Sequence, residues 1–516
     1  MSRILARQGA GDFEIKAEKG ESLLDALRRS GLDFPAPCGG NGKCGKCRVE
    51  IDAGGRRESV LACRYRIDGD ISLYLPEQSG GEICREGKQV DITYKAGHES
   101  GRHGLGAAVD IGTTTLAVRL YDLEQGRELG SRGAWNSQSP FGADVISRCQ
   151  YIMERDDGLE LLKERIQSQI FAMIGELAAD CGRAGEKPEE LFAAGNTVME
   201  HIFLGLSPAG MAVAPFRPIS LFTERELVYI RNIKTFLSPC VAAYVGGDIT
   251  AGLLSSGLWD REGLNLFLDV GTNGEMALGG REGFVCCAVA SGPAFEGAGI
   301  SCGMPSTTGA IAEVKWTEKG FEAEAIGGGE AKGLCGSGLI SLLALLLELG
   351  AVDEWGRLLP PEEAPEELRP WLSEDDNGNG CFHLTGKVYL SAGDVRQLQL
   401  AKAAVAAGIE VLTEELGICA GDIGGAYIAG GFGSHLDLRA AAAIGMLPEE
   451  LADRAEALGN SALGGAAMAL LDTDSREELY RIQEKCRYIE LTGDARFNRA
   501  FPAHMTFGKE DELEWN

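Results

Sequence analysis

Two segments of this chain share one plan, and that repeat limits the possible folds more than any other feature. AVDIGTTTLAVRLYD (108–122) and FLDVGTNGEMALGG (267–280) each contain an apolar strand that ends in Asp, a Gly–Thr turn and a second strand. The equivalent pairs are Asp110 with Asp269, Gly112 with Gly271, Thr113 with Thr272 and, after a slip of one residue, Ala117 with Ala277. A duplicated half-domain produces such a repeat, and two facing halves form a cleft.

The repeat lies within a chain of 516 residues, which is too long for a single hydrophobic core. Residues 1–80 read as a small β-rich domain with a short helix capped by Ser22, and residues 81–104 read as a polar linker. From residue 105 onward, strands alternate with longer helical stretches, as in α/β folds. We therefore expect the two halves to span 105–262 and 263–516.

Charge also separates the first segment from the rest. Residues 1–80 contain 13 Lys/Arg and 12 Asp/Glu, whereas the remaining residues contain 36 and 65. The net charge of −28 argues against binding to nucleic acid, whose phosphates require a basic surface. The longest apolar run (338–352) is shorter than a membrane span and contains Glu348, so we expect a buried helix and no membrane association. The N-terminus has no apolar signal region, and the expected location is cytoplasmic.

The two hairpins have the chemistry of a phosphate site. A tight Gly-containing turn presents backbone amides and Thr hydroxyls to phosphate oxygens. The Asp at each strand end can hold Mg²⁺ through water or orient an attacking water. We therefore assign Asp110 and Asp269 as candidate catalytic residues. The candidate phosphate-binding residues are Gly112, Thr113, Thr114, Gly271, Thr272 and Asn273.

A third element, GAYIAGGFGSHLDL (425–438), joins an apolar strand to a helix through a glycine-rich turn. Glycines there let the backbone lie against a purine and ribose. Gly430, Gly431 and Phe432 are the candidates, and the three elements together predict ATP binding. Asn196 and Asp248 each stand near a probable helix start and are further candidates for the cleft. The chain has no Walker A motif and no convincing dinucleotide-binding G-x-G-x-x-G.

Cys38, Cys44, Cys47 and Cys63 form a C-x5-C-x2-C-x15-C pattern in PCGGNGKCGKC and LAC. A [2Fe–2S] cluster takes four thiolates, and the nearby glycines allow backbone amides to point at the sulfurs. Structural zinc is the alternative, but zinc folds usually show two C-x2-C knuckles and this pattern has one. The spacing therefore favours [2Fe–2S]. The other cysteines lack ligand spacing and are expected to be buried thiols.

These motifs, with GNTVMEH, ASGPAFEGAGI, DVRQLQLAKAAVAAGI and IAGGFGSH, resemble the reductive activators of corrinoid proteins over about residues 10–508. That family belongs to the acetate and sugar kinase–heat-shock–actin (ASKHA) superfamily. The resemblance implies a multidomain fold: a β-grasp-like α+β ferredoxin domain followed by an α/β, actin-like pair of RNase H-like halves. Longer family members carry an extra small domain where this chain has only the linker.

The resemblance also implies a function. Such an activator uses ATP to pass one low-potential electron from its cluster to an inactive Co(II) corrinoid protein and so restores Co(I) for methyl transfer. The implied cofactors are [2Fe–2S], ATP and Mg²⁺, and the implied partners are the corrinoid protein and an upstream low-potential electron donor. Homodimerisation is compatible with the superfamily, and the cysteine usage suits an anaerobe.

Three alternatives stay open from the sequence. An activator of radical dehydratases or of another low-potential reductase shares the superfamily, although such activators hold a [4Fe–4S] cluster between subunits. A small-molecule kinase is compatible with the fold, because fold does not fix function. A redox-sensing scaffold that binds nucleotide without turnover is the third.

Overall fold

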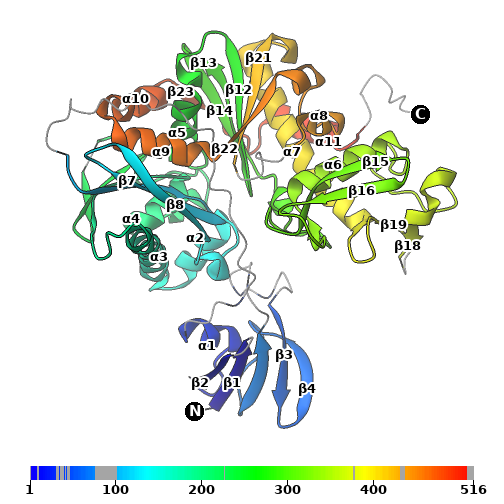
Figure 1. The fold of residues 1–516 in the computed structure, drawn as a ribbon, viewed down its shortest axis with the longest axis horizontal. Coiled ribbons are helices and arrows are strands. Elements are labelled where there is room, and N and C mark those ends of the chain that lie inside the picture. Colours follow the sequence, from blue (N-terminus) through cyan, green and yellow to red (C-terminus); the bar gives the residue numbers. More distant parts are fainter. Residues whose placement is uncertain are drawn as a thin grey trace.

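The computed structural model describes residues 2–8, 11–30, 34, 36, 40, 42, 47–75, 102–225, 227–375, 378–430 and 436–507. The elements and contacts reported below belong to these residues. They form a small N-terminal domain and a larger body built on two main sheets (Figure 1).

The N-terminal domain is a mixed sheet covered by one helix. Its strand order is β2-β1-β5-β3-β4, with β1 and β5 parallel. The expected short helix is confirmed as α1, and its cap is Ser22, whose hydroxyl accepts from the Asp25 amide at 3.1 Å. Alternate strand residues face a separate apolar core under α1. The elements are β1 (Ser2–Gln8), β2 (Gly11–Ala17), α1 (Leu23–Arg29), β3 (Arg48–Ala53), β4 (Arg56–Leu61) and β5 (Ile71–Leu75).

The first half of the larger body is a sheet of strand order β10-β11-β9-β6-β7-β8. Its central strands β6 and β9 are parallel. Strand β6 is apolar except for Asp110, and β9 is apolar from Leu191 onward, as expected for strands covered on both faces. Helix α3 packs against β7 and β8. The elements are β6 (Leu105–Ile111), β7 (Thr115–Asp122), β8 (Arg127–Trp135), α2 (Val145–Glu154), α3 (Gly158–Asp180), β9 (Pro188–Gly195), α4 (Thr197–Leu204), β10 (Val228–Ile230), β11 (Ile233–Leu237) and α5 (Gly247–Ser256).

The second half repeats this plan with the strand order β22-β21-β12-β13-β14-β23. Its long helix α7 packs against β13 and β14. The elements are β12 (Leu264–Val270), β13 (Gly274–Gly280), β14 (Gly283–Val289), α7 (Ala392–Leu416), β21 (Ile423–Ala429), α8 (Leu438–Ala443), β22 (Ala455–Gly459), α9 (Ser461–Leu471), α10 (Thr473–Glu484), β23 (Cys486–Tyr488) and α11 (Ala495–Ala503).

The two halves share a core. Helix α9 follows β22 of the second sheet, yet it packs on β6 and β9 of the first sheet and on α5. One apolar cluster accordingly contains Phe192 from the first sheet and Phe267 from the second, together with Leu463 of α9. Burial of this common apolar surface holds the ends of β6 and β12 at one cleft.

Two small sheets and an apolar helix lie beside the main sheet of the second half (Figure 1). Residues 338–348 of the predicted apolar run form most of helix α6, which is buried along most of its length. No helix among the described residues is long and apolar enough to cross a membrane. These elements are β15 (Ala310–Thr317), β16 (Gly320–Ala325), β17 (Gly333–Leu334), α6 (Gly336–Glu348), β18 (Leu372–Glu374), β19 (Gly380–His383) and β20 (Tyr389–Ser391).

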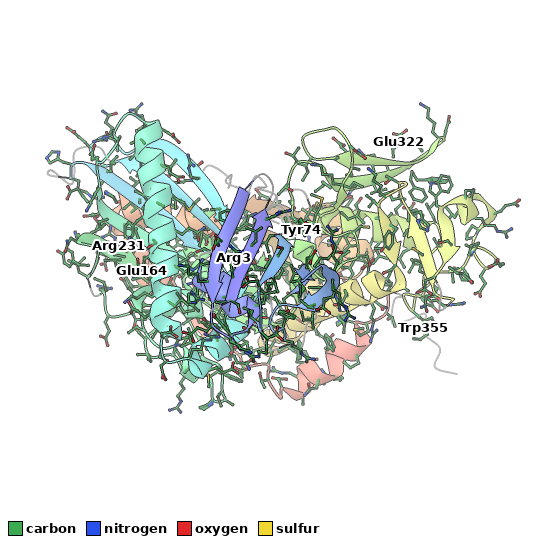
Figure 2. All side chains as sticks on the ribbon, turned by 90° about the horizontal axis from the view of Figure 1, so that it is seen from below. Arg3, Tyr74, Glu164, Arg231, Glu322 and Trp355 are labelled. Carbon is green, nitrogen blue, oxygen red and sulfur yellow. The ribbon has the colours of Figure 1, made fainter. Side chains whose placement is uncertain are left out.

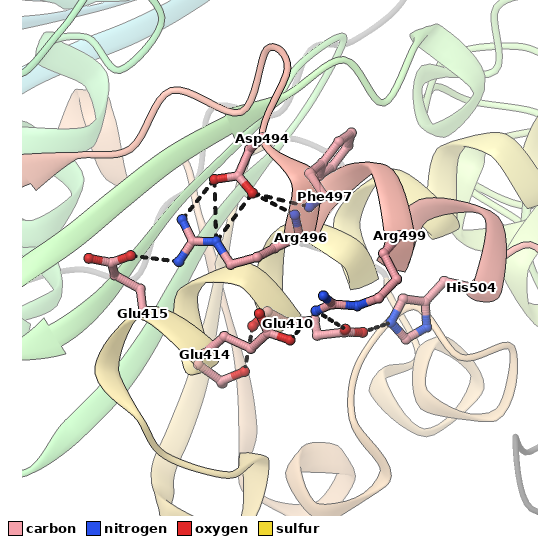
Figure 3. A network of polar contacts seen from close by, with 9 residues as sticks. Glu410, Glu414, Glu415, Asp494, Arg496, Phe497, Arg499 and His504 are labelled. Atoms are coloured by element: carbon pink, nitrogen blue, oxygen red, sulfur yellow. Dashed lines mark hydrogen bonds and ion pairs between the residues drawn. The ribbon is translucent and has the colours of Figure 1, made fainter.

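The C-terminal helix α11 is fastened to α7 by a polar network (Figure 3). Asp494 caps α11 by accepting from the Arg496 and Phe497 amides. The Arg496 guanidinium also contacts Glu415 of α7 at 2.6 Å. At the other end of α11, His504 Nε2 lies 2.7 Å from the Glu410 carboxylate.

The N-terminal domain contacts the first half through α1. The Arg155 guanidinium lies 2.8 Å from the Asp25 carboxylate. Arg28 donates to the Pro140 carbonyl, and its guanidinium carbon lies 4.9 Å from the centre of the Phe141 ring. In Figure 2 this domain, marked by Arg3 and Tyr74, is seen in front of the larger body, between the Glu164–Arg231 ion pair and the side that carries Glu322 and Trp355. The contact places the domain beside the segment that follows the first hairpin.

Candidate functional site

A cavity of about 430 Å³ lies where the two hairpins meet. Both halves contribute to its walls. Of the residues proposed from the sequence, those that line it are Asp110, Gly112, Thr113, Thr114, Asn196, Asp248, Asp269, Gly271, Thr272, Asn273 and Gly430. Gly431 and Phe432 lie outside the described residues. The structure therefore brings together residues that are up to 320 positions apart in the chain.

Asp110 is the penultimate residue of β6, and a residue of the second half holds its carboxylate. Asn460 caps the N-terminus of α9 and donates from Nδ2 to Asp110 Oδ2 at 2.8 Å. Burial raises the pKa of Asp110 to about 7, the Asn460 hydrogen bond opposes that shift and the charge of Asp269 adds to it. Sequence reasoning missed Asn460, because nothing local marks it as more than a helix cap.

The loop of the first hairpin is held by two side chains of its own half. Asn196 caps α4 and donates from Nδ2 to Thr113 Oγ1 at 2.8 Å. The wholly buried Arg148 of α2 donates to the Thr113 carbonyl and, at 3.0 Å, to the Gly142 carbonyl. These contacts connect the hairpin to the segment next to the N-terminal domain.

The second hairpin is one residue shorter than the first, which changes its chemistry. The strand ladder sets Ala117 opposite Asp110, but it sets Glu275 opposite Asp269. The expected match of Ala117 with Ala277 is therefore wrong. The second hairpin is one residue shorter than the first, not longer, so the residue equivalent to Ala117 is Glu275. The shorter turn places a carboxylate, Glu275, on the cavity wall at the position equivalent to alanine.

Several carboxylate side chains line this cavity close to one another. Burial, followed by the charges of Asp269 and Asp110, raises the pKa of Asp248 to about 8. Burial and then the Glu296 charge raise the pKa of Asp269 to about 6. Burial raises the pKa of Glu275 well above its usual value, with Asp248 and Asp269 adding to the shift. Crowded carboxylates favour a bound cation or proton, and oxygen ligands of this kind suit Mg²⁺. Among the described residues, however, no three acidic, His or Cys side chains are grouped closely enough to hold a metal ion by themselves.

Glu296 is a further residue that sequence reasoning did not single out. It ends a 3-10 turn (Pro293–Glu296) within the glycine-rich ASGPAFEGAGI motif. Its carboxylate accepts from Thr114 Oγ1 at 3.1 Å and from Thr272 Oγ1 at 2.9 Å. The two hairpins are thus joined through a third segment of the chain.

The sulfur site lies in the N-terminal domain. Cys47 precedes β3 and Cys63 follows β4; both are buried, and their Sγ atoms are 3.2 Å apart. Gly40 and Gly42, from the loop before Cys47, have φ of 104° and 72°, a conformation that glycine adopts readily. Two converging buried thiols beside a glycine-rich loop fit iron–sulfur ligation. Cys38 and Cys44 lie outside the described residues.

Family models match the chain in three consecutive parts. Residues 7–68 match the 2Fe-2S iron-sulfur cluster binding domain, residues 105–261 match the RACo middle region, and residues 263–515 match the C-terminal domain of RACo, the ASKHA domain. The chain belongs to the RACo family. The N-terminal part is therefore an iron–sulfur domain, and the expected ferredoxin–ASKHA fold is confirmed.

Relatives of this RACo-family chain match along most of their length. The corrinoid activation enzyme RamQ of Eubacterium limosum is 28% identical, with 96% of this chain and 98% of RamQ covered. A Methanosarcina barkeri protein named [Co(II) methylated amine-specific corrinoid protein] reductase is 25% identical, with 78% and 77% covered. The solved structure of a reductive activator for corrinoid, iron-sulfur protein is 28% identical, covers 98% of each chain and has a TM-score of 0.70.

Proposed function

We propose that this protein is an ATP-dependent reductive activator that transfers one low-potential electron to an inactive Co(II) corrinoid protein and restores Co(I) for methyl transfer. The observation that carries the proposal is that one chain joins an iron–sulfur domain with a buried thiol pair to a cleft lined by two phosphate-type hairpins. The named relatives, RamQ and the amine-specific reductase, support the same activity.

The proposal assigns the chain as 1–80 ferredoxin-type domain, 81–104 linker, and 105–262 and 263–516 as the two ASKHA halves. Cys38, Cys44, Cys47 and Cys63 would hold the [2Fe–2S] cluster. When bound, the cluster supplies a one-electron donor. Cobalt gains the electron that the reduced cluster loses, and an upstream low-potential donor must then restore the cluster.

The cleft residues have separate tasks in the proposal. The hairpin residues Gly112, Thr113, Thr114, Gly271, Thr272 and Asn273 donate hydrogen bonds to the nucleotide phosphates. Asp110 and Asp269 hold Mg²⁺ through water or orient the attacking water. Asn196 positions the Thr113 hydroxyl. Gly430, with Gly431 and Phe432, lies against the purine and ribose.

ATP is required because the electron moves to a low-potential acceptor. For one electron, about 59 mV is a tenfold change in equilibrium, so an acceptor 100 mV below the cluster leaves roughly one electron in fifty transferred. Nucleotide binding in a cleft between two halves can shift the population toward a productive complex. A reducing compartment suits a chain of 15 cysteines, so we place the protein in the cytoplasm, with a homodimer as a compatible assembly.

The test uses the reduced, cluster-loaded protein with a Co(II) corrinoid protein, and the Co(I) absorption spectrum is followed with and without Mg·ATP. Co(I) should accumulate only with ATP. The Asp269→Asn variant should retain the cluster but no longer accumulate Co(I) when ATP is added. Equal activation without ATP would disprove the proposal. Phosphorylation of a metabolite without corrinoid reduction would favour the kinase alternative.

A further inference from the structure

One carboxylate oxygen connects the two halves of the cleft. Glu296 Oε2 accepts from Thr114 of the first hairpin at 3.1 Å and from Thr272 of the second at 2.9 Å. The two hydroxyl oxygens are themselves 3.3 Å apart. The hydroxyl donors of both hairpins therefore converge on one carboxylate oxygen of the protein.

Backbone geometry holds Glu296 in this position. The flanking Gly292 and Gly297 have φ of 73° and 76°, which other residues rarely adopt. The other carboxylate oxygen, Oε1, packs against the turn of the second hairpin: a Cβ at Gly271 would lie 3.3 Å from it. The carboxylate is consequently seated on the hairpin turn and does not extend into solvent.

A nucleotide phosphate needs the same donors. Phosphate and carboxylate oxygens are both anionic acceptors of hydroxyl and amide hydrogens, and their charge-assisted hydrogen bonds are strong. A phosphate placed between Thr114 and Thr272 would meet the Glu296 carboxylate at close range. The two anions would repel each other, so they would not share these hydroxyls.

We propose that Glu296 competes with a nucleotide phosphate for the hydroxyls of Thr114 and Thr272. This inference rests on the proposed ATP site. Nucleotide binding then requires Glu296 to leave both hydroxyls. The contact of Glu296 with Thr114 and Thr272, here called the latch, is then replaced by contacts with the ligand. Nucleotide binding is thereby coupled to the contact between the two halves.

The first test measures binding of Mg·AMP-PNP to the cluster-loaded protein by calorimetry. Glu296→Ala should bind at least about tenfold more tightly than the wild type, because the competing acceptor and its charge are gone. Glu296→Gln, which loses the charge but keeps an acceptor oxygen, should lie between them. Glu282→Ala removes one exposed negative charge from the β13–β14 turn and should bind like the wild type.

A second test asks whether the tighter binding of Glu296→Ala requires the hydroxyls of Thr114 and Thr272 or follows only from removal of a negative charge. In a Thr114→Val/Thr272→Val background, the gain from Glu296→Ala should fall to less than about twofold, because the contested donors are absent. A full gain in that background would overturn the competition. Without nucleotide, Glu296→Ala should also speed amide hydrogen exchange in 112–115 and 271–274, and unchanged exchange would overturn the latch.

The outcomes distinguish this inference from the proposed function. A wild type that binds Mg·AMP-PNP, with Glu296→Ala no tighter, overturns the inference alone. Absence of binding by the wild type and by all variants overturns both the inference and the proposed ATP dependence.

Discussion

Asn460, at the N-terminus of α9, donates a hydrogen bond of 2.8 Å to Asp110, at the end of β6, across 350 positions of sequence. The donor follows β22, an edge strand of the second sheet, and the acceptor lies near the end of β6 in the first sheet. Because α9 crosses to pack on the first sheet, its cap reaches the phosphate-type hairpin of the other half. The pKa of Asp110, in the first half, therefore depends on a residue of the second half.

Asn460→Ala should move the acid limb of the pH profile of Mg·ATP hydrolysis upward by roughly one unit, because a hydrogen bond to an ionised group favours its charged form. The pKa of Asp110 is already raised to about 7, and the bond from Asn460 lowers it. Loss of that bond raises this pKa further, so the carboxylate ionises only at higher pH. Asn379→Ala, at an exposed asparagine bound to Asp375, is the control. An unchanged acid limb would contradict the assignment of Asp110.

Cys47→Ser and Cys63→Ser should each abolish the visible absorption and the EPR signal of the reduced [2Fe–2S] cluster, since a hydroxyl is a poor substitute for a thiolate ligand. Both sulfurs are buried and 3.2 Å apart. Cys419→Ser, at an exposed thiol, should retain the full cluster content. Nucleotide binding should survive in all three variants, because the cleft lies in the larger body. A cluster that persists in Cys47→Ser would refute the ligand assignment.

The ion pair between Asp25 and Arg155 should contribute to docking of the N-terminal domain. Both side chains are about two-fifths exposed, and such pairs are worth about 0–1 kcal/mol, so Arg155→Asp should loosen the contact moderately. Small-angle scattering should show a larger radius of gyration for Arg155→Asp at low salt. The exchanged pair, Asp25→Arg with Arg155→Asp, should recover the wild-type value. Failure of the exchange to restore compactness would show that the pair does not guide docking.

Asp494→Ala should destabilise α11 by about 1 kcal/mol at neutral pH, because it removes an N-cap. The hydrogen bond from Arg496 lowers the pKa of Asp494 to about 2. A depressed folded-state pKa gives stability above the unfolded value near 3.8, which is lost as pH falls toward 2. Amide hydrogen exchange in residues 495–503 should therefore be faster in the variant, and the difference should shrink at acid pH. Asp474→Ala, in the first turn of α10, serves as the control, since exchange within α11 should not respond to it.

The local sequence pattern was sufficient to predict the two hairpins, the helix α1 and the cysteine motif. The period of the apolar residues and the Gly–Thr turns predicted both hairpins, and the Asp residues at the strand ends do line one cavity. The pattern of SLLDALRR predicted α1 and its Ser22 cap. The cysteine spacing predicted an iron–sulfur domain, and the matching family model agrees. These features depend on residues within a few positions of each other, so the sequence alone determined them.

Tertiary packing decided which other side chains reach the site. Glu275 faces the cavity because the second turn is one residue shorter than the first. The pairing of the strands shows this difference, whereas the alignment of the two sequence segments did not. Glu296 and Asn460 come from segments 182 and 350 positions away from their partners Thr114 and Asp110. Their convergence follows from two sheets packed around α5 and α9 over a shared apolar core. Burial of that surface fixes the relative placement of the segments, and no local pattern encodes it.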